Sequence, residues 1–346
     1  MPVGTYMMKA LIRKIESGSD LSRQEAEGAM EEILSGRSDE ETIVSLLAAL
    51  RAKGETVGEL VGFARAMRRQ VTPVFPNGAR PEELLVDTCG TGGDSSGTFN
   101  ISTAAAFVAA GAGVRVAKHG NRSISSKCGS ADVLEALGVS LEIPPERVGA
   151  SIHEIGIGFL FAPALHTAMR HAMPARRRLG RTAFNLLGPL TNPAGARAQV
   201  AGVFSDRVVE KVAQVLSELD VERAFVVHGA GGLDEISLCG ETTVGDVRGT
   251  VVSIYQITPE DFGLERAPLE AIAGGDAARN ADLIRAILGG EKGPRRDIIV
   301  ANASAAIVAG GRAADFLEGA QMAAQSIDSG TASKKLDALI AFTATS

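Results

Sequence analysis

DTCGTGGDSSGTFNIST, at residues 87–103, is the stretch from which we predict the fold of this chain. The apolar run Leu84-Leu85-Val86 comes directly before it and predicts a buried strand. The alanine-rich run at 104–110 comes after it, is closed by Gly111, and predicts a helix. A strand, a glycine loop and a helix in this order direct several backbone N–H groups and the positive end of a helix dipole to one point. Such a point suits a phosphate or a pyrophosphate.

This loop matches neither standard nucleotide signature. A P-loop requires Lys and then Ser or Thr after its last glycine, but Asp94 follows Gly93 here. The dinucleotide fingerprint GxGxxG fails as well, because GTG at 90–92 is followed by GDS. A glycine-rich turn before a helix is often purely structural, so the hydroxyl groups that follow it are what favour an anion site. These are Ser95, Ser96, Thr98, Ser102 and Thr103.

Length and composition indicate an ordinary soluble globular protein. The 346 residues suggest one large domain and one smaller one, and 45% of them are hydrophobic and 22% charged. No apolar run reaches membrane-spanning length and no secretory pattern opens the chain, so we expect a cytoplasmic protein without a membrane segment. A net charge of -6 argues against a general nucleic-acid binder. The three cysteines lie far apart, which predicts reduced thiols and no zinc site.

The amino-terminal residues 1–75 predict a small helical domain. Three capping boxes, each with a hydroxyl at the N-cap and Glu three residues later, begin at Ser22, Ser38 and Thr56. Apolar residues recur behind them at helical spacing, as in Ile43, Leu46, Leu47, Leu50 and in Val57, Leu60, Val61, Ala64. About four short amphipathic helices bury little by themselves. We therefore expect them to pack on the large domain or on a second copy of the chain.

Residues 80–346 predict a large α/β domain. Strand-like runs at 84–88, 114–117, 158–161, 200–204 and 224–227 alternate with helical ones such as 207–219, which indicates a mostly parallel central sheet flanked by helices. The runs 242–247 and 251–256 predict an edge hairpin. Helices are expected at 280–288, 297–309, 314–326 and 332–342.

Two more strand-end loops carry polar groups. The strand at 114–117 leads into KHGNRSISSKCGSAD, and the strand at 224–227 leads into HGAGGLDEI. Loops at the carboxyl ends of neighbouring parallel strands share one crevice, so basic and hydroxyl groups should face the glycine loop. Adjacent Asp234 and Glu235 suit a magnesium ion that also binds substrate phosphates. The basic residues could instead be a solvated run, His119 a core histidine, and the acidic pair simply solvated.

The motifs GTGGD, TFNIST, KHGNRSISSKCGSADVLEALG, FNLLGPLTNP and GLDEIS, in this order, resemble the anthranilate phosphoribosyltransferase family of tryptophan biosynthesis. The resemblance covers nearly the whole chain. It implies transfer of phosphoribosyl from 5-phosphoribosyl 1-pyrophosphate to anthranilate, with Mg²⁺ as two ions in each active site. It also implies a homodimer formed through the helical domain, and we expect a segment near residues 172–190 to join that domain.

The resemblance also implies the site residues, and it assigns none of them as a covalent nucleophile. The phosphoribosyl pyrophosphate side would be Gly90, Gly93, Asp94, Thr98, Asn100, Ile101, Ser102, Thr103, Lys118, Ser126 and Ser130. Anthranilate would lie against Gly90, His119, Asn121 and Arg176, and the metal ligands would be Ser102, Asp234 and Glu235. The family often has one more residue within the stretch that here reads RLGRT at 178–182, so Arg177 and Arg178 remain alternatives to Arg176. We expect no chemistry from Cys128, which stands where serine is common.

Two other functions are compatible with this architecture. A pyrimidine nucleoside phosphorylase would use phosphate in place of pyrophosphate, but its glycine-loop and lysine motifs differ from those of this chain. A non-enzymatic relative would bind nucleic acid through a basic groove, whereas this chain is acidic and keeps its substrate motifs.

Overall fold

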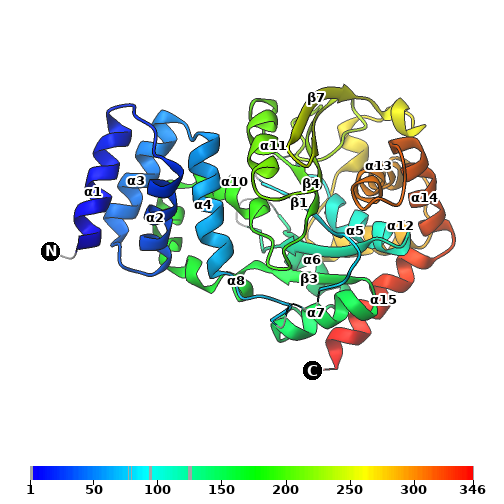
Figure 1. The fold of residues 1–346 in the computed structure, drawn as a ribbon. Coiled ribbons are helices and arrows are strands. Elements are labelled where there is room, and N and C mark those ends of the chain that lie inside the picture. Colours follow the sequence, from blue (N-terminus) through cyan, green and yellow to red (C-terminus); the bar gives the residue numbers. More distant parts are fainter. Residues whose placement is uncertain (1–2, 77, 79, 93–95, 124–126, 346) are drawn as a thin grey trace.

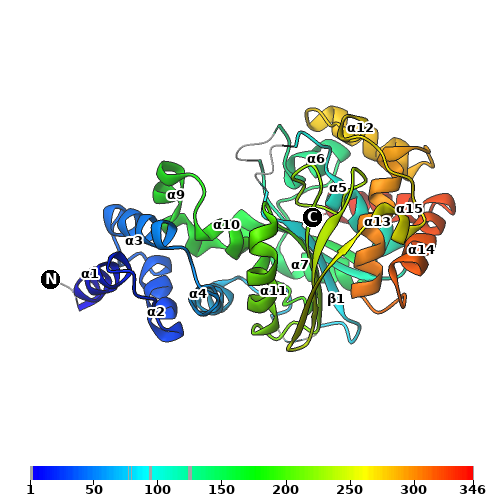
Figure 2. The same ribbon diagram turned by 90° about the horizontal axis from the view of Figure 1, so that it is seen from above.

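The computed structural model describes residues 3–76, 78, 80–92, 96–123 and 127–345. A small amino-terminal group of helices lies at one end of the molecule, and a larger α/β part holds most of the remaining chain (Figure 1). Seen from above, the sheet stands between two layers of helices (Figure 2). This arrangement confirms the predicted fold class.

A seven-stranded sheet forms the centre of the large part, in the order β3-β2-β1-β4-β5-β6-β7. β3, β2, β1, β4 and β5 are parallel, and β6 and β7 add an antiparallel hairpin at the edge, as predicted. The strands are β1 (Leu85–Gly90), β2 (Arg115–Gly120), β3 (Ile157–Phe161), β4 (Ala198–Gly202), β5 (Arg223–Gly229), β6 (Thr242–Arg248) and β7 (Val251–Ile257). Because the five parallel strands point the same way, their carboxyl ends meet at one edge.

Helices cover both faces of this sheet. Val200, Phe225 and Val227 belong to a core shared with α5 and α13, whereas Ala201 and Val226 belong to a second core shared with α11. The helices of the large part are α5 (Ile101–Gly111), α6 (Ser130–Leu137), α7 (Pro145–Glu154), α8 (Ala162–Leu165), α11 (Val209–Ser217), α12 (Ala277–Leu288), α13 (Pro294–Ala309), α14 (Phe316–Asp328) and α15 (Thr331–Ala344). Within the described residues, no helix combines the length and the apolar character that a membrane span requires.

The amino-terminal helices begin largely where their caps predict. They are α1 (Val3–Glu16), α2 (Arg23–Leu34), α3 (Glu40–Lys53) and α4 (Val57–Gln70). Ser22 and Thr56 form the predicted capping boxes with Glu25 and Glu59. The box predicted at Ser38 is wrong: Asp39 is the N-cap of α3, and its carboxylate accepts the Thr42 N–H at 2.8 Å. An aspartate caps as well as a serine, and its charge also favours the positive helix end.

The helical part packs against the large part through α4. The Arg68 guanidinium donates to the carbonyl oxygens of Leu190 at 2.8 Å and of Leu219 at 2.7 Å. The core of the helical part also includes residues of α9 (Met173–Leu179) and α10 (Ala183–Leu187), which are distant in sequence. Figure 2 shows α9 and α10 beside α3 and α4. The amino-terminal helices therefore bury their apolar faces against a later segment of the same chain.

Candidate active site

The glycine loop begins at the carboxyl end of β1 and lies directly against the loop that follows β5. The Gly92 N–H donates to Asp234 Oδ2 at 2.8 Å, and Gly92 has a positive φ of 66°. A Cβ on Gly90 would clash with the same carboxylate, and one on Gly202 would clash with the Asp234 backbone. Glycine is therefore required at these strand ends because the Asp234 loop approaches their backbone closely.

The amino-terminal end of α5 adds donors to the same place. The Ser102 N–H donates to Glu235 Oε1 at 3.1 Å, and the Thr88 hydroxyl donates to the Ser102 carbonyl at 3.2 Å. Thr103 is 1% exposed, and its hydroxyl has no hydrogen-bond partner in the described part of the chain. A buried hydroxyl without a partner at a helix amino terminus is the arrangement expected where an anionic ligand binds.

Lys118 brings a buried ammonium to this group. It is 3% exposed, and its Nζ donates to the Thr88 carbonyl and lies 3.4 Å from Ser102 Oγ. Burial lowers its pKa, and the negative charge of Asp87 and of Glu235 opposes that shift. Desolvation is costly for an ammonium unless anions are near. This position therefore favours an anionic partner.

Asp234 and Glu235 form an acidic pair on the loop after β5. Asn302 of α13 fixes this loop, since its side chain accepts the Ile236 N–H at 2.9 Å and donates to the Ile236 carbonyl at 3.0 Å. Burial and the adjacent Asp234 charge raise the pKa of Glu235 to about 8. Two close carboxylates with excess negative charge suit a hard divalent cation. The described residues contain no group of three or more His, Cys, Asp or Glu side chains able to hold a metal, so a cation here would need further oxygen ligands.

The structure pairs His119 with His166, which the sequence did not predict. Their Nε2 atoms lie 3.1 Å apart, and both side chains are buried. Burial lowers the pKa of His119 to about 3 and that of His166 to about 4. Both rings are therefore neutral near pH 7, one as donor and the other as acceptor. His166 follows α8, and no local sequence pattern connects it with a residue 47 positions earlier.

The loop after β2 is fixed by bonds to α6. Ser130 Oγ accepts the Asn121 N–H at 3.1 Å, and Asp132 Oδ2 accepts the N–H groups of Ser123 at 3.0 Å and Gly129 at 2.8 Å. Arg122 does not join the anion site, because its guanidinium pairs with Glu135 and Asp132. Of the basic residues predicted there, Lys118 is thus the one that the structure buries beside the glycine loop.

Asn100 connects the glycine-loop stretch with the loop after β2 through its side chain. Its Nδ2 donates to the Cys128 carbonyl at 3.2 Å, and its Oδ1 accepts Asn280 Nδ2 at 3.0 Å. Asn280 lies on α12, is 1% exposed, and also accepts the Gly275 N–H at 2.7 Å. We call these residues the Asn100–Cys128–Asn280 clamp. Sequence reasoning missed Asn280, because it lies 180 positions from Asn100.

Arg176 stands apart from Arg177 and Arg178. Burial lowers its pKa, its guanidinium stacks on the Phe184 ring at 5.3 Å, and no charged partner for it occurs in the described residues. Arg178 instead forms an ion pair with Glu41. Arg176 lies on α9 and is not among the residues that contact the glycine loop.

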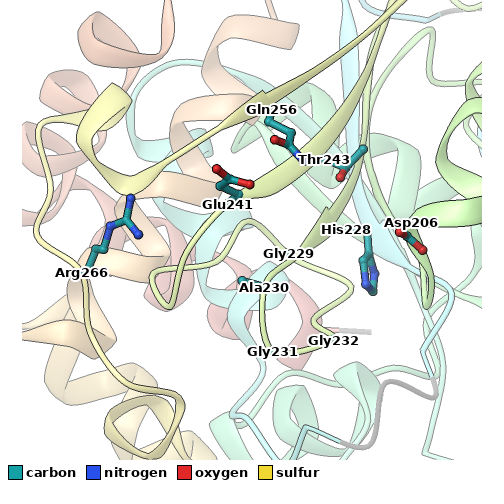
Figure 3. Close-up of a pocket in the computed structure, with 10 residues that line it drawn as sticks. All are labelled: Asp206, His228, Gly229, Ala230, Gly231, Gly232, Glu241, Thr243, Gln256 and Arg266. Atoms are coloured by element: carbon teal, nitrogen blue, oxygen red, sulfur yellow. The ribbon is translucent and has the colours of Figure 1, made fainter.

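A separate cavity of about 590 Å³ lies beside the turn after β5 (Figure 3). It is lined by Asp206, His228, Gly229, Ala230, Gly231, Gly232, Glu241, Thr243, Gln256 and Arg266. None of the predicted site residues is among them. This cavity therefore lies beside the predicted site and is not part of it.

Among the predicted residues, the described contacts unite Gly90, Ser102, Lys118, Asp234 and Glu235. Thr103 and Ile101 open the same helix, and Thr98 lies just before it in a bridge with Ala273. His119 lies at the end of β2, Asn121 follows that strand, and Ser130 opens α6. Gly93, Asp94 and Ser126 lie outside the described residues.

Both parts of the chain match one protein family. Residues 82–333 match the glycosyl transferase family α/β domain, and residues 9–71 match the helical bundle domain of that family. The chain therefore belongs to the glycosyl transferase family.

Similar proteins in this family are anthranilate phosphoribosyltransferases. The chain is 53% identical over 337 residues to that of Symbiobacterium thermophilum, covering 97% of this chain and 98% of the relative. It is 54% identical over 338 residues to the enzyme of Pelotomaculum thermopropionicum, and the match covers 97% of this chain and 97% of that relative.

Solved structures of the same enzyme resemble this fold. The Thermus thermophilus structure has a TM-score of 0.91 at 46% identity, with 96% of this chain and 99% of that one covered. The Saccharomyces cerevisiae structure in complex with phosphoribosyl pyrophosphate and Mg has a TM-score of 0.89 at 28% identity, with 98% of each chain covered.

Proposed function

We propose that this chain transfers the phosphoribosyl group of 5-phosphoribosyl 1-pyrophosphate to the amine of anthranilate. The products are N-(5-phosphoribosyl)anthranilate and pyrophosphate, as in tryptophan biosynthesis. Relatives that align over nearly the full chain carry this enzyme name, and the yeast enzyme binds phosphoribosyl pyrophosphate with Mg.

The observation that carries the proposal is the junction of Gly92, Ser102, Lys118, Asp234 and Glu235. Backbone N–H groups, a buried ammonium and two carboxylates meet there at the ends of three strands. This combination suits a pyrophosphate with its metal. The ammonium and the N–H groups can bind phosphate oxygens once a cation takes the carboxylates to which the Gly92 and Ser102 N–H groups donate in this structure. The orphan Thr103 hydroxyl adds a phosphate donor.

The acidic pair fits Mg²⁺. Asp234, Glu235 and the Ser102 hydroxyl offer hard oxygen ligands, and magnesium normally takes one or two carboxylates and completes its shell with water and substrate phosphates. The raised pKa of Glu235 indicates that positive charge is favoured beside it. We assign these residues as ligands, with two ions in each site. Bound Mg²⁺ supplies charge neutralisation of the pyrophosphate leaving group.

The reaction breaks the bond between ribose C1 and a pyrophosphate oxygen, which leaves a cationic sugar and an anionic leaving group. Lys118 and the amides of the glycine loop stabilise the departing charge. Gly90, Gly93, Asp94, Thr98, Asn100, Ile101, Ser126 and Ser130 complete the pocket of this substrate. No side chain acts as a covalent nucleophile, because the acceptor amine attacks C1 itself.

The acceptor is oriented from the other side of the site. Arg176 binds the anthranilate carboxylate, since its planar guanidinium has no charged partner in the described protein and offers two parallel donors. Gly90, His119 and Asn121 face the ring and amine. An aromatic amine is uncharged at neutral pH, so orientation supplies the catalytic contribution here.

We further propose a cytoplasmic homodimer formed through the helical domain, with domain boundaries at 1–75 and 80–346. The segment at 172–190 belongs with the helical domain, which the shared core of Ala175, Phe184 and Leu187 with the amino-terminal helices supports.

The decisive experiment mixes purified protein with anthranilate, phosphoribosyl pyrophosphate and Mg²⁺ and follows the loss of anthranilate fluorescence. Loss that requires all three components supports the transferase. Cleavage of uridine or thymidine with phosphate would instead identify a nucleoside phosphorylase, and a gel shift with DNA a nucleic-acid-binding relative.

A further inference from the structure

The backbone pairing between β1 and β2 stops just before the active site. Their parallel pairing includes Leu85 with Arg115 and Val86 with Val116, and it goes no further. Each strand nevertheless continues, because β1 pairs with β4 to Gly90 and β2 pairs with β3 to Gly120. The end of the β1–β2 ladder leaves backbone groups of β2 without a strand partner.

Two buried side chains bond those backbone groups. In a parallel ladder, one residue of a strand bonds two groups of the neighbouring strand. These are the carbonyl of one residue and the N–H of the residue two positions later, so they lie on either side of a single residue. Here the flanked residue is Lys118. The His119 N–H donates to Asp87 Oδ1 at 2.9 Å, and Asn192 Nδ2 donates to the Ala117 carbonyl at 2.9 Å.

The same two side chains are bonded to each other. Asn192 Nδ2 also donates to Asp87 Oδ2 at 2.7 Å, and Asn192 Oδ1 accepts the Ala194 N–H at 2.9 Å. Asp87 is 0% exposed and Asn192 is 9% exposed. Burying a carboxylate so completely costs stability, and the hydrogen bonds with Asn192 and His119 offset only part of that cost. A simple continuation of the strand pairing would have avoided it.

We infer that Asp87 and Asn192 are positioning residues for Lys118. They hold the backbone on both sides of Lys118 where the β1–β2 ladder is interrupted, so that its Nζ reaches the Thr88 carbonyl and Ser102 Oγ. Asn192 belongs to the segment after α10, near Leu190, which α4 contacts through Arg68. The segment that links the two parts of the molecule therefore also fixes the ammonium that binds pyrophosphate. This inference rests on the proposed function of Lys118.

An exchange of the two side chains tests this assignment. Asp87→Asn replaces one of the two carboxylate oxygens by an NH₂ group, so that a donor faces either Asn192 Nδ2 or the His119 N–H. Asn192→Asp places two carboxylates together. The double variant Asp87→Asn/Asn192→Asp restores a donor–acceptor pair with the same total charge and loses the bond to the Ala117 carbonyl. We expect each single variant to lower kcat/KM for phosphoribosyl pyrophosphate by about tenfold to a hundredfold, as loss of an orienting partner does. The double variant should recover part of that loss.

Asp246→Asn is the matched control. Asp246 is likewise a buried carboxylate, 5% exposed, but it pairs with Arg223 at the opposite end of β5 from the site. This variant should lose thermal stability and keep kcat/KM close to that of the unmodified protein. If Asp87→Asn does not fold, Asn192→Ala replaces it in the test. This variant removes the Asn192 donors to Asp87 and to the Ala117 carbonyl without changing the charge.

Calorimetric affinity for pyrophosphate with Mg²⁺ is measured on the same variants. This affinity tests the positioning role without anthranilate. If the unmodified protein does not use anthranilate, that result overturns only the proposed function. The inference is overturned if Asp87→Asn keeps both its kcat/KM and its pyrophosphate affinity, if the double variant recovers nothing, or if Asp246→Asn loses as much affinity as Asp87→Asn.

Discussion

Several residues of this site carry a charge, and the burial of charged side chains costs free energy of folding. Lys118 and Asp87 are buried and Glu235 is partly buried, and desolvation shifts the pKa of each toward its neutral form. Their mutual attraction offsets part of the cost, and a substrate that brings phosphates and a cation would offset more. The site is therefore arranged for a charged ligand at some expense of stability.

Removing either member of the acidic pair should weaken the binding of magnesium. Asp234→Ala and Glu235→Ala each delete a proposed cation ligand, and Asp234→Ala also deletes the acceptor of the Gly92 N–H. We expect turnover to fall sharply and the Mg²⁺ concentration for half-maximal rate to rise about tenfold or more. Rates measured against Mg²⁺ concentration check this. Glu241→Ala, an exposed carboxylate after the same loop, should change neither, and an unchanged magnesium profile in Asp234→Ala would contradict the assignment.

The two paired histidines should make the protein sensitive to mild acid. Their folded pKa values, about 3 for His119 and about 4 for His166, lie below the usual 6.5. The unfolded chain therefore binds more protons below pH 6.5, so the free energy of unfolding falls as the pH falls from 6.5 toward 4. The charge of Lys118 acts on the pKa of His119 in the same direction as burial, whereas a backbone group of Gly188 opposes it.

Urea unfolding at pH 7 and pH 5 measures this effect. Each histidine should contribute a loss of about 1 to 2 kcal/mol over that interval, since one proton is worth about 1.4 kcal/mol per pH unit. His119→Gln/His166→Gln should lose much less stability between the two pH values. An equal loss in this double variant would assign the acid sensitivity to other groups.

Among the site residues, the sequence predicted those that stand in local motifs. It missed those that reach the site from distant segments of the chain. Gly90 and Lys118 lie near the carboxyl ends of β1 and β2, and Asp234 and Glu235 lie on the loop after β5. A parallel sheet places all these positions at one edge. Asn192, Asn280 and His166 enter the site from segments that are distant in sequence. Nothing in their neighbourhood distinguishes them from ordinary loop or helix residues until the chain is folded.

Elements of regular structure were predicted where periodicity or caps are strong. All seven strands overlap the predicted runs, and the apolar positions of α3 and α4 are largely buried. The short helices between 130 and 190 were not predicted individually. α8 has 4 residues and α10 has 5, so neither contains enough turns to show a helical period. Their helical form depends on packing against neighbours.

α12 contributes to the site through the Asn100–Cys128–Asn280 clamp. Asn280→Ala removes a buried donor to Asn100 and the acceptor of the Gly275 N–H. We expect a loss of about 1 to 3 kcal/mol in the free energy of unfolding, because buried partners remain unsatisfied. The KM for phosphoribosyl pyrophosphate should rise as well, since the two loops are no longer fixed to each other.

A double-mutant cycle with Asn100→Ala isolates this contact. Urea unfolding of the two single variants and of Asn100→Ala/Asn280→Ala should give a coupling energy of about 0.5 kcal/mol or more. Strictly additive losses would show that the two residues act independently. Ser329→Ala, which alters a hydrogen bond outside the site, serves as the control for general effects on the carboxyl-terminal helices.

The whole molecule combines a sheet part that holds the pyrophosphate site and a helical part that carries α9 with Arg176. The Arg68 contacts and the shared core keep the two parts together. The residues proposed for the two substrates therefore lie on different parts, and the segment with Asn192 lies between those parts. The boundaries 1–75 and 80–346 remain a prediction, since the core of the helical part extends into α9, α10 and α11.

The outer surface of α1 tests the proposed dimer. α1 turns Met8, Leu11 and Ile15 inward, whereas Tyr6 is 72% exposed, the largest exposure among the large apolar side chains described. An exposed aromatic residue on an amphipathic helix suits an interface with a second copy. Light scattering after size-exclusion chromatography should therefore give twice the 35.8 kDa of one chain.

Tyr6→Glu should shift this mass toward the monomer, because a charge would be buried without a partner at the interface. Leu317→Glu is the matched control: Leu317 is 47% exposed on α14, in the large part of the molecule. Its substitution should leave the dimer intact. A monomeric unmodified protein at micromolar concentration would refute the dimer, and dissociation by Leu317→Glu but not by Tyr6→Glu would place the interface on the large part instead.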